Sequence, residues 1–240
     1  MIWTWRDRWE RATFAPCAET AILACPGPSL VGAPKNLQGP QRTVFAINTA
    51  YPTVRPDYWI GMDEAFCDDP NLLDESFPKL YRGSYSQMEY DGVPVRKSPS
   101  TYFIDVAAVQ DNQTMFDVQG GFAWHNHTLG VALHFIIWLG ARRIYLLGCD
   151  LGGNADYCHD LKLTDEQRKR NRRLYAQQEY FLDELSIVCR QYRIELLSAT
   201  PQSSINQFLP YRPIEDVIAI EPRTGKPRYV LDRPSEGRNQ

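Results

Sequence analysis

The sequence predicts an α/β fold in which helices cover both faces of a mainly parallel sheet. Short runs of consecutive apolar residues alternate along the chain with longer segments of helical periodicity. The runs are apolar throughout, as strands are when both of their faces are buried. Each run ends in a polar or glycine-containing turn, which is typical of the connection from a strand to a helix.

Three strands are expected in the first third of the chain, over 19–24, 43–47 and 58–61. Residues 67–80 predict a loop with a helical turn. The segment 81–122 places tyrosines among glycine, serine and proline, and predicts short strands in a lid-like excursion.

Helices and strands alternate again in the second half. The pattern predicts a helix over 126–139 ended by Gly140, a strand over 144–147, a helix from the capping box at Thr164 to about Tyr192, a strand over 194–197 and a short helix over 214–218. We therefore expect one Rossmann-like α/β domain over 1–212, with 81–122 as its lid, and a C-terminal tail over 213–240.

The composition agrees with one ordinary folded domain. Of the 240 residues, 43% are apolar and 12% aromatic, which excludes a wholly disordered chain. The 26 basic and 29 acidic residues give a net charge of −3, which disfavours a globally basic nucleic-acid binder. No apolar run approaches the roughly 20 residues of a membrane-spanning helix.

The N-terminus lacks the apolar segment of a secretory signal, so a cytoplasmic location is expected. The six cysteines are scattered and contain no CxxC pair, which favours thiols in or near the core over disulfides or a zinc site. We expect no metal centre.

Polar residues follow each expected strand. Because ligands of such sheets bind at the carboxyl ends of the strands, these residues are expected to converge on one crevice. They are Pro26, Gly27, Pro28 and Ser29, then Asn48, Asp63 and Asp150, and finally the segment 198–204.

Each of these groups has a functional and a purely structural interpretation. The turn with Gly27 and Ser29 can present N–H groups to a phosphate, or serve as a plain turn. Asn48 can read a base or a sugar hydroxyl, or only form the turn. Asp63 and Asp150 can hold a ribose hydroxyl, orient a histidine or bind Mg²⁺, or cap a helix.

Three histidines are candidates for chemistry. His125 and His127 lie at the start of the helix over 126–139, where they can meet a phosphate or cap the helix. His159 follows Asp150 in a loop and is the best candidate general acid or base, the alternative being an ordinary surface residue. A basic run over 168–173 is either a solvated face or a means of steering a phosphorylated substrate.

Four segments, in the correct order, resemble a set of known families. These are Ala21 to Leu30 with its Pro-Gly-Pro-Ser turn, Val44 to Asn48, Leu139 to Asp150, and Leu196 to Phe208. The set comprises bacterial lipooligosaccharide sialyltransferases that use CMP-sialic acid, the 6-hydroxymethylpterin pyrophosphokinase-like family, and uncharacterised phage proteins. The resemblance covers roughly residues 18–210 and is more specific for fold than for reaction.

The sialyltransferase resemblance implies a nucleotide-activated sugar donor and no essential metal. It implies that Tyr157 holds the donor phosphate and that His159 deprotonates an acceptor hydroxyl, with Asp150 as a third catalytic candidate. The candidates for binding the nucleotide are Gly27, Pro28, Ser29, Asn48, Asp63, His125, Thr128 and Ser203.

Three functions follow as hypotheses. The first is a glycosyltransferase that uses a nucleotide sugar by direct displacement. The second, implied by the pterin enzymes, is Mg²⁺-dependent transfer of diphosphate from ATP to a hydroxymethyl group, with Asp63 and Asp150 on the metal. The third is a non-catalytic nucleotide-binding protein.

The sequence leaves the acceptor open between a glycan, a small molecule and a hydroxymethylated DNA base. It also leaves the oligomeric state open, a homo-oligomer included. If the chain is phage-encoded, as part of the resemblance implies, it would act in the host cytoplasm.

Overall fold

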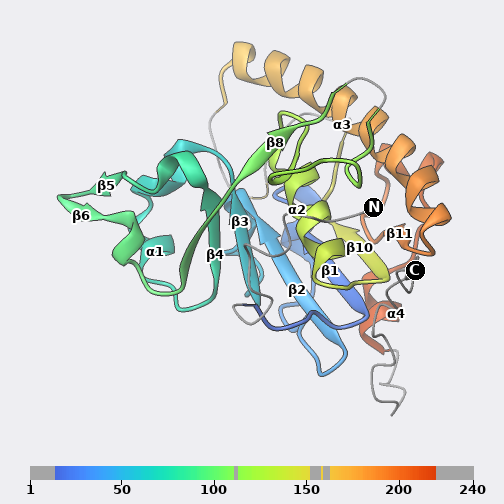
Figure 1. The fold of residues 1–240 in the computed structure, drawn as a ribbon. Coiled ribbons are helices and arrows are strands. Elements are labelled where there is room, and N and C mark those ends of the chain that lie inside the picture. Colours follow the sequence, from blue (N-terminus) through green and yellow to red (C-terminus); the bar gives the residue numbers. More distant parts are fainter. Residues whose placement is uncertain (1–13, 111–112, 152–157, 159–162, 220–240) are drawn as a thin grey trace, which may run out of the picture.

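A seven-stranded, wholly parallel sheet organises the molecule (Figure 1). The computed structural model describes residues 14–110, 113–151, 158 and 163–219. Along the sheet the strand order is β11-β10-β1-β2-β3-β4-β7. The strands are β1 (Thr20–Ala24), β2 (Arg42–Ile47), β3 (Tyr58–Gly61), β4 (Lys79–Arg82), β7 (Thr101–Ile104), β10 (Arg143–Leu147) and β11 (Glu195–Ser198). This arrangement confirms the expected Rossmann-like α/β class.

Two strands of the sheet lie where the sequence predicted a loop or the short strands of a lid-like excursion. β4 begins at the end of the expected loop 67–80, and β7 lies inside the expected lid 81–122. The part of 81–122 that leaves the sheet includes a small hairpin of β5 (Glu89–Tyr90) and β6 (Val93–Pro94), which projects to one side (Figure 1). A lid function for that part stays a prediction.

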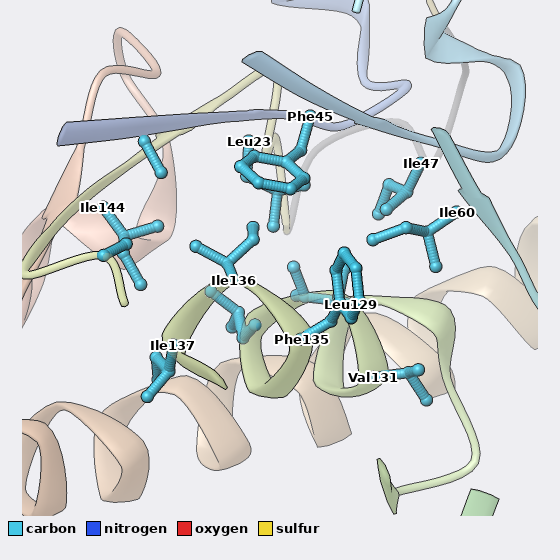
Figure 2. Packing of buried hydrophobic residues seen from close by; sticks show 14 of the residues in the cluster. Leu23, Phe45, Ile47, Ile60, Leu129, Val131, Phe135, Ile136, Ile137 and Ile144 are labelled. Atoms are coloured by element: carbon cyan, nitrogen blue, oxygen red, sulfur yellow. The ribbon is translucent and has the colours of Figure 1, made fainter. Parts of the chain in front are cut away.

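One face of the sheet is covered by two layers of helix. Every residue of α2 (Thr128–Trp138) is buried, because the helix lies between the strands and α3 (Asp165–Gln191). Leu129 and Phe135 of α2 point toward Phe45 and Ile60 of the sheet (Figure 2). A helix enclosed in this way is apolar around its whole circumference, as this one is.

The opposite face is covered by shorter pieces. Trp59, Tyr81 and Tyr145 pack there against two short helices, α1 (Pro70–Leu73) and α4 (Ile214–Ala219), and against several 3₁₀ turns.

Beside α2, a further pair of short parallel strands, β8 (Val106–Ala108) and β9 (Phe122–Trp124), leads the chain into the helix. β9 therefore fixes where α2 begins.

The chain that follows β11 returns along the outer edge of that strand. The Ser198 N–H donates to the Pro210 carbonyl at 3.0 Å, and the Arg212 N–H donates to the Ser198 carbonyl at 2.9 Å. Tyr211 forms an isolated parallel bridge with Ser198. The short helix expected over 214–218 follows as α4, while residues 220–240 of the expected tail lie outside the described part.

All six cysteines lie in the described part, and none forms a disulfide. Among the described helices, none has the length and apolar character required to cross a bilayer.

Candidate functional site

A cavity of about 200 Å³ opens at the carboxyl ends of β1, β2, β3 and β10. Its walls come from six parts of the chain: the turn after β1, the end of β2, the end of β3, the start of α2, the end of β10 and one face of α3. The lining residues are Cys25, Pro26, Gly27, Ile47, Asn48, Asp63, Trp124, Asn126, His127, Thr128, Leu129, Gly148, Cys149, Asp150, Leu151, Arg170, Asn171, Leu174, Tyr175 and Gln178. This is the place that the sequence predicted for the crevice.

Five of the residues named as catalytic or nucleotide-binding candidates line this cavity, namely Gly27, Asn48, Asp63, Thr128 and Asp150, and so do Pro26 and His127, which were also expected near the crevice or the helix start. Pro28, Ser29, His125 and Ser203 do not line it and lie behind or beside its walls. Tyr157 and His159, the two catalytic candidates that the resemblance implied, lie outside the described residues and stay predictions.

The turn after β1 has no hydrogen-bond donor to spare. The Gly27 N–H donates to the Gly148 carbonyl at 2.9 Å, and the Leu30 N–H to the Gly27 carbonyl at 3.0 Å. Asp150 Oδ2 accepts both the Ser29 N–H, at 3.0 Å, and the Ser29 hydroxyl, at 2.7 Å. Pro26 and Pro28 carry no N–H. The phosphate cradle, one of the two interpretations of this turn, is therefore absent in this conformation, because Gly148, Asp150 and the turn itself take up the donors.

Close packing explains the glycines on this wall. A Cβ on Gly27 would lie 2.2 Å from Asp150 Oδ2 and 2.4 Å from the Gly148 carbonyl oxygen. Gly148 itself has a φ of +70°, and a Cβ there would lie 2.3 Å from the Cys25 carbonyl oxygen. Both positions need glycine because the backbones after β1 and β10 touch.

Ser203 supports the cavity floor from behind. Its hydroxyl donates to the Cys149 carbonyl at 2.7 Å. The Cys149 N–H in turn donates to Thr200 Oγ1 at 3.0 Å. Cys149 also hydrogen-bonds to the Cys25 thiol, which together with burial raises the pKa of Cys25 well above its usual range. The Cys25 thiol is thus protonated and poorly nucleophilic.

Asn48 offers an unused acceptor inside the cavity wall. The residue has a φ of +51°, a left-handed conformation that asparagine tolerates better than most residues. Its backbone carbonyl accepts the Trp59 indole N–H at 2.7 Å, which fixes the turn. Its side-chain Oδ1 is buried and accepts no hydrogen bond from the described residues. A buried polar atom of this kind calls for a partner, and a ligand hydroxyl or amino group in the cavity would supply one.

Asp63 and Arg170 face the cavity from opposite sides, one after β3 and the other on α3. Partial burial raises the pKa of the Asp63 carboxyl, and the Arg170 guanidinium opposes that shift. The Asp63 side chain is exposed and can meet a ligand, and the charge of Arg170 acts on its carboxyl group. Together the two side chains give the cavity both signs of charge.

At the start of α2 two histidines pack against α3. The centroids of the His125 and His127 rings lie 4.4 and 4.8 Å from that of Phe181. His127 is the N-cap of α2, and its Nδ1 accepts the Gly130 N–H at 3.0 Å. Burial, followed by the proximity of His125, lowers the pKa of His127 to about 4. Burial also lowers the pKa of His125.

The α3 wall was missed by sequence reasoning. Arg170, Leu174 and Gln178 follow one another at four-residue spacing, with Asn171 and Tyr175 beside them, so one face of the helix lines the cavity. The basic run had been noted, and Arg170 is the member of it that lines this cavity. The sequence signal that could have revealed this wall is the helical spacing of uncharged polar residues, Asn171 and Gln178, within the charged helix.

The described residues contain no group of three or more histidines, cysteines or carboxylates that could hold a metal ion. Asp63 and Asp150, the carboxylates of the Mg²⁺-dependent alternative, do line the same cavity, although one oxygen of Asp150 already accepts from Ser29.

A scan against models of protein families and a search of curated protein sequences found no match. Solved structures do match. The chain is similar in fold to the sialyltransferase CstII from Campylobacter jejuni in complex with a substrate analogue, CMP-3FNeuAc. The TM-score is 0.50 at 15% identity, over 81% of this chain and 86% of that chain. A second CstII structure, with cytidine-5'-monophosphate, gives a TM-score of 0.47 at 18% identity, over 81% and 85% of the two chains.

At this level of identity the likeness shows the fold alone. It confirms the sialyltransferase part of the resemblance at that level, whereas the likeness to the pterin enzymes and to phage proteins stays a prediction.

Proposed function

We propose that the protein is a glycosyltransferase that uses a nucleotide sugar, with the nucleotide held in the cavity at the strand ends. One observation carries the proposal: the buried Asn48 Oδ1, which has no hydrogen-bond partner among the described residues, lies on a residue that lines a cavity of about 200 Å³ at the ligand-binding end of the sheet. The solved structure of similar fold was obtained with a nucleotide-sugar analogue, CMP-3FNeuAc, which supports this choice of ligand class.

The proposed reaction is a direct displacement at the sugar. An acceptor hydroxyl attacks the anomeric carbon, the bond from that carbon to the phosphate oxygen breaks, and the electron pair leaves with the nucleotide. A base takes the hydroxyl proton, and His159 is our candidate for that base, with Tyr157 on the departing phosphate. Asp63 would meet the donor, and Asp150 would act mainly by holding the turn after β1 in place.

The acceptor remains one of three classes: a glycan, a small molecule or a modified base of DNA. The Mg²⁺-dependent transfer of diphosphate is kept as the second candidate because Asp63 and Asp150 line the same cavity. In the third candidate function the protein binds a nucleotide in the same cavity but catalyses no reaction.

A thermal-shift screen tests the proposal. CMP, CDP, UDP, GDP and ATP would each be added with Mg²⁺ and with EDTA. We expect a pyrimidine nucleotide to raise the melting temperature equally in both conditions, since saturation at a hundred times Kd stabilises by about 2.7 kcal/mol. Stabilisation by ATP that EDTA abolishes would favour the diphosphate-transfer alternative instead.

The variant Asn48→Gly locates the binding in this cavity. Glycine accepts the left-handed φ of +51° and removes only the amide, so we expect about tenfold weaker nucleotide binding with little change in fold. Ser100→Gly is the matched control, because Ser100 is exposed, has a φ of +52° and does not line the cavity. Equal affinity in the two variants would contradict the proposed site.

A further inference from the structure

Four cations in the first half of α3 form no ion pair within the described part of the protein. They are Lys169, Arg170, Arg172 and Arg173, and all four residues are exposed. This half of the helix lies at the margin of the molecule (Figure 1). Like charges one turn apart repel, and the amino end of a helix already carries partial positive charge, so the cluster costs stability. Its presence at that cost favours a role in binding an anionic partner.

The cluster borders a second hollow, of about 400 Å³, on the surface of α3. Among the described residues that line it, Lys169, Arg170 and Arg173 are cations and only Glu166 is an anion. The hollow shares Arg170 and Leu174 with the cavity at the strand ends, so the two adjoin. A partner that binds here therefore lies directly beside the candidate functional site.

An amide and an aromatic ring continue the same face of the helix. Lys169, Arg173, Gln177 and Tyr180 follow one another at spacings of four, four and three residues, which places them in one row along α3. Tyr180 is 66% exposed, and its hydroxyl donates to Glu184 Oε1 at 2.5 Å. That hydrogen bond orients the ring while most of it remains in solvent.

The combination of charges and ring along this row selects the class of partner. A neutral glycan or small molecule has no charge for the four cations to bind, and a single carboxylate occupies only some of them. A polyanion occupies all four, and guanidinium groups bind phosphate through two parallel hydrogen bonds. A nucleic-acid strand also carries bases that stack on an exposed aromatic ring, as they do on other surfaces that bind single strands.

We propose that the row from Lys169 to Tyr180 on α3, with Arg170 and Arg172 beside it, binds the phosphates and a base of a nucleic-acid strand. The binding surface stands by itself, and only its link to sugar transfer rests on the proposed function. A strand bound there brings its bases next to the cavity, so the modified base of DNA is the acceptor class that this surface fits. The hydroxyl oxygen of that base would bond to the anomeric carbon as the nucleotide leaves and the general base takes the proton.

Fluorescence anisotropy with a labelled DNA strand of about 20 nucleotides, at about 50 to 200 mM salt, measures the binding. The double variant Lys169→Gln/Arg173→Gln removes two cations that do not line the cavity, so its affinity for CMP should stay that of wild type. We expect about tenfold weaker binding of the strand at the lower salt. The slope of log Kd against log salt should also decrease by about 1.4.

The matched control is the double variant Lys35→Gln/Arg55→Gln. It removes the same charge at two exposed positions that line neither the cavity nor the hollow. Its affinity for the strand should change less than about twofold, since charges far from the bound strand are screened by salt.

Tyr180 distinguishes a nucleic acid from other polyanions. Tyr180→Phe loses the hydrogen bond to Glu184 and keeps the ring, whereas Tyr180→Ala loses both. We expect wild-type affinity for the strand in Tyr180→Phe and about tenfold weaker binding in Tyr180→Ala. A heparin fragment, which is a polyanion without bases, should bind equally to wild type and Tyr180→Ala.

Three results overturn the inference: no binding of the strand to wild type at about 50 mM salt, equal losses in the two double variants, or an unchanged affinity in Tyr180→Ala. An unchanged affinity in Tyr180→Ala, with heparin competing for the same cations, would identify the partner as an acidic glycan instead. The proposed function fails separately. Binding of the strand without binding of any nucleotide leaves this surface in place and overturns the proposed function, and the opposite result does the reverse.

Discussion

The two walls of the cavity use their hydrogen-bond donors in opposite ways. After β1, each N–H from Gly27 to Leu30 that is not removed by proline has a partner inside the protein, chiefly on β10. At the start of α2, the N–H groups of Thr128 and Leu129 have no partner among the described residues. A glycine-containing turn after a strand is thus not by itself an anion site. The first wall acts as scaffold, and the second carries the candidate chemistry.

The largest loss of stability is expected from adding a side chain at Gly27, in the turn after β1. Gly27→Ala places a methyl group 2.2 Å from Asp150 Oδ2 and 2.4 Å from the Gly148 carbonyl oxygen, so the two strand ends must separate. We expect a loss of about 3 kcal/mol in the free energy of unfolding, measured with urea. Gly32→Ala is the control, since nothing lies within 4 Å of its added Cβ. A loss below about 1 kcal/mol in Gly27→Ala would mean that this wall is pliable.

The second-largest effect is a loss of stability at acidic pH, caused by His127 at the start of α2. The pKa of His127 falls from 6.5 in the unfolded chain to about 4 in the folded protein, so the unfolded chain binds more protons between these values. This contribution to stability is complete above pH 6.5 and is lost as the pH falls to 4, amounting to about 3 kcal/mol.

Unfolding of wild type and His127→Asn at several pH values checks this prediction, and the difference between them isolates His127 from the groups around it. Those groups are His125 on the same segment, Asp63 and Asp150 across the cavity, and Arg170 and Tyr175 on α3. A difference that stays constant from pH 7 to pH 4 would show that His127 does not titrate as its burial requires.

The smallest effect tests whether the scaffold wall takes part in binding at all. Ser29→Ala removes the hydroxyl that donates to Asp150 Oδ2 at 2.7 Å and keeps the backbone donor at 3.0 Å. Stability should fall by about 1 kcal/mol, while the Kd for CMP should not change. A clear rise in that Kd, seen by calorimetry, would restore the turn after β1 as a ligand-binding element.

Strands buried on both faces were predictable because their sequences are continuously apolar. β1, β2, β3, β10 and β11 were expected within a residue or two of their observed bounds. β4 was not expected, since it begins and ends with a basic residue, and β7 was expected only as one of the short strands of a lid-like excursion. Lys79 is fully buried nonetheless, and its ammonium group donates to the Glu75 carbonyl. A hydrogen bond of this kind, which allows a lysine to be buried, cannot be predicted from the hydropathy of the sequence.

The site was predictable where it follows from the sheet and not where it depends on distant contacts. Asn48, Asp63 and Asp150 converge because the carboxyl ends of parallel strands share an edge. The pairing of Ser29 with Asp150 joins residues 121 positions apart, and it removes the donors that made the turn resemble a phosphate cradle. The periodicity of the α3 sequence indicates an apolar and a polar face, but it does not indicate which residues of the helix lie over the carboxyl ends of the strands.

The return of the chain along β11 has a consequence for self-association. A strand at the margin of a sheet presents unpaired N–H and carbonyl groups, which form a template for another chain. Here Pro210, Tyr211 and Arg212 occupy those groups on Ser198. A chain cut before Pro210 would leave the margin open at Ser198, so the residues that follow the 3₁₀ turn over 204–207 protect the carboxyl end of β11 against edge-to-edge pairing.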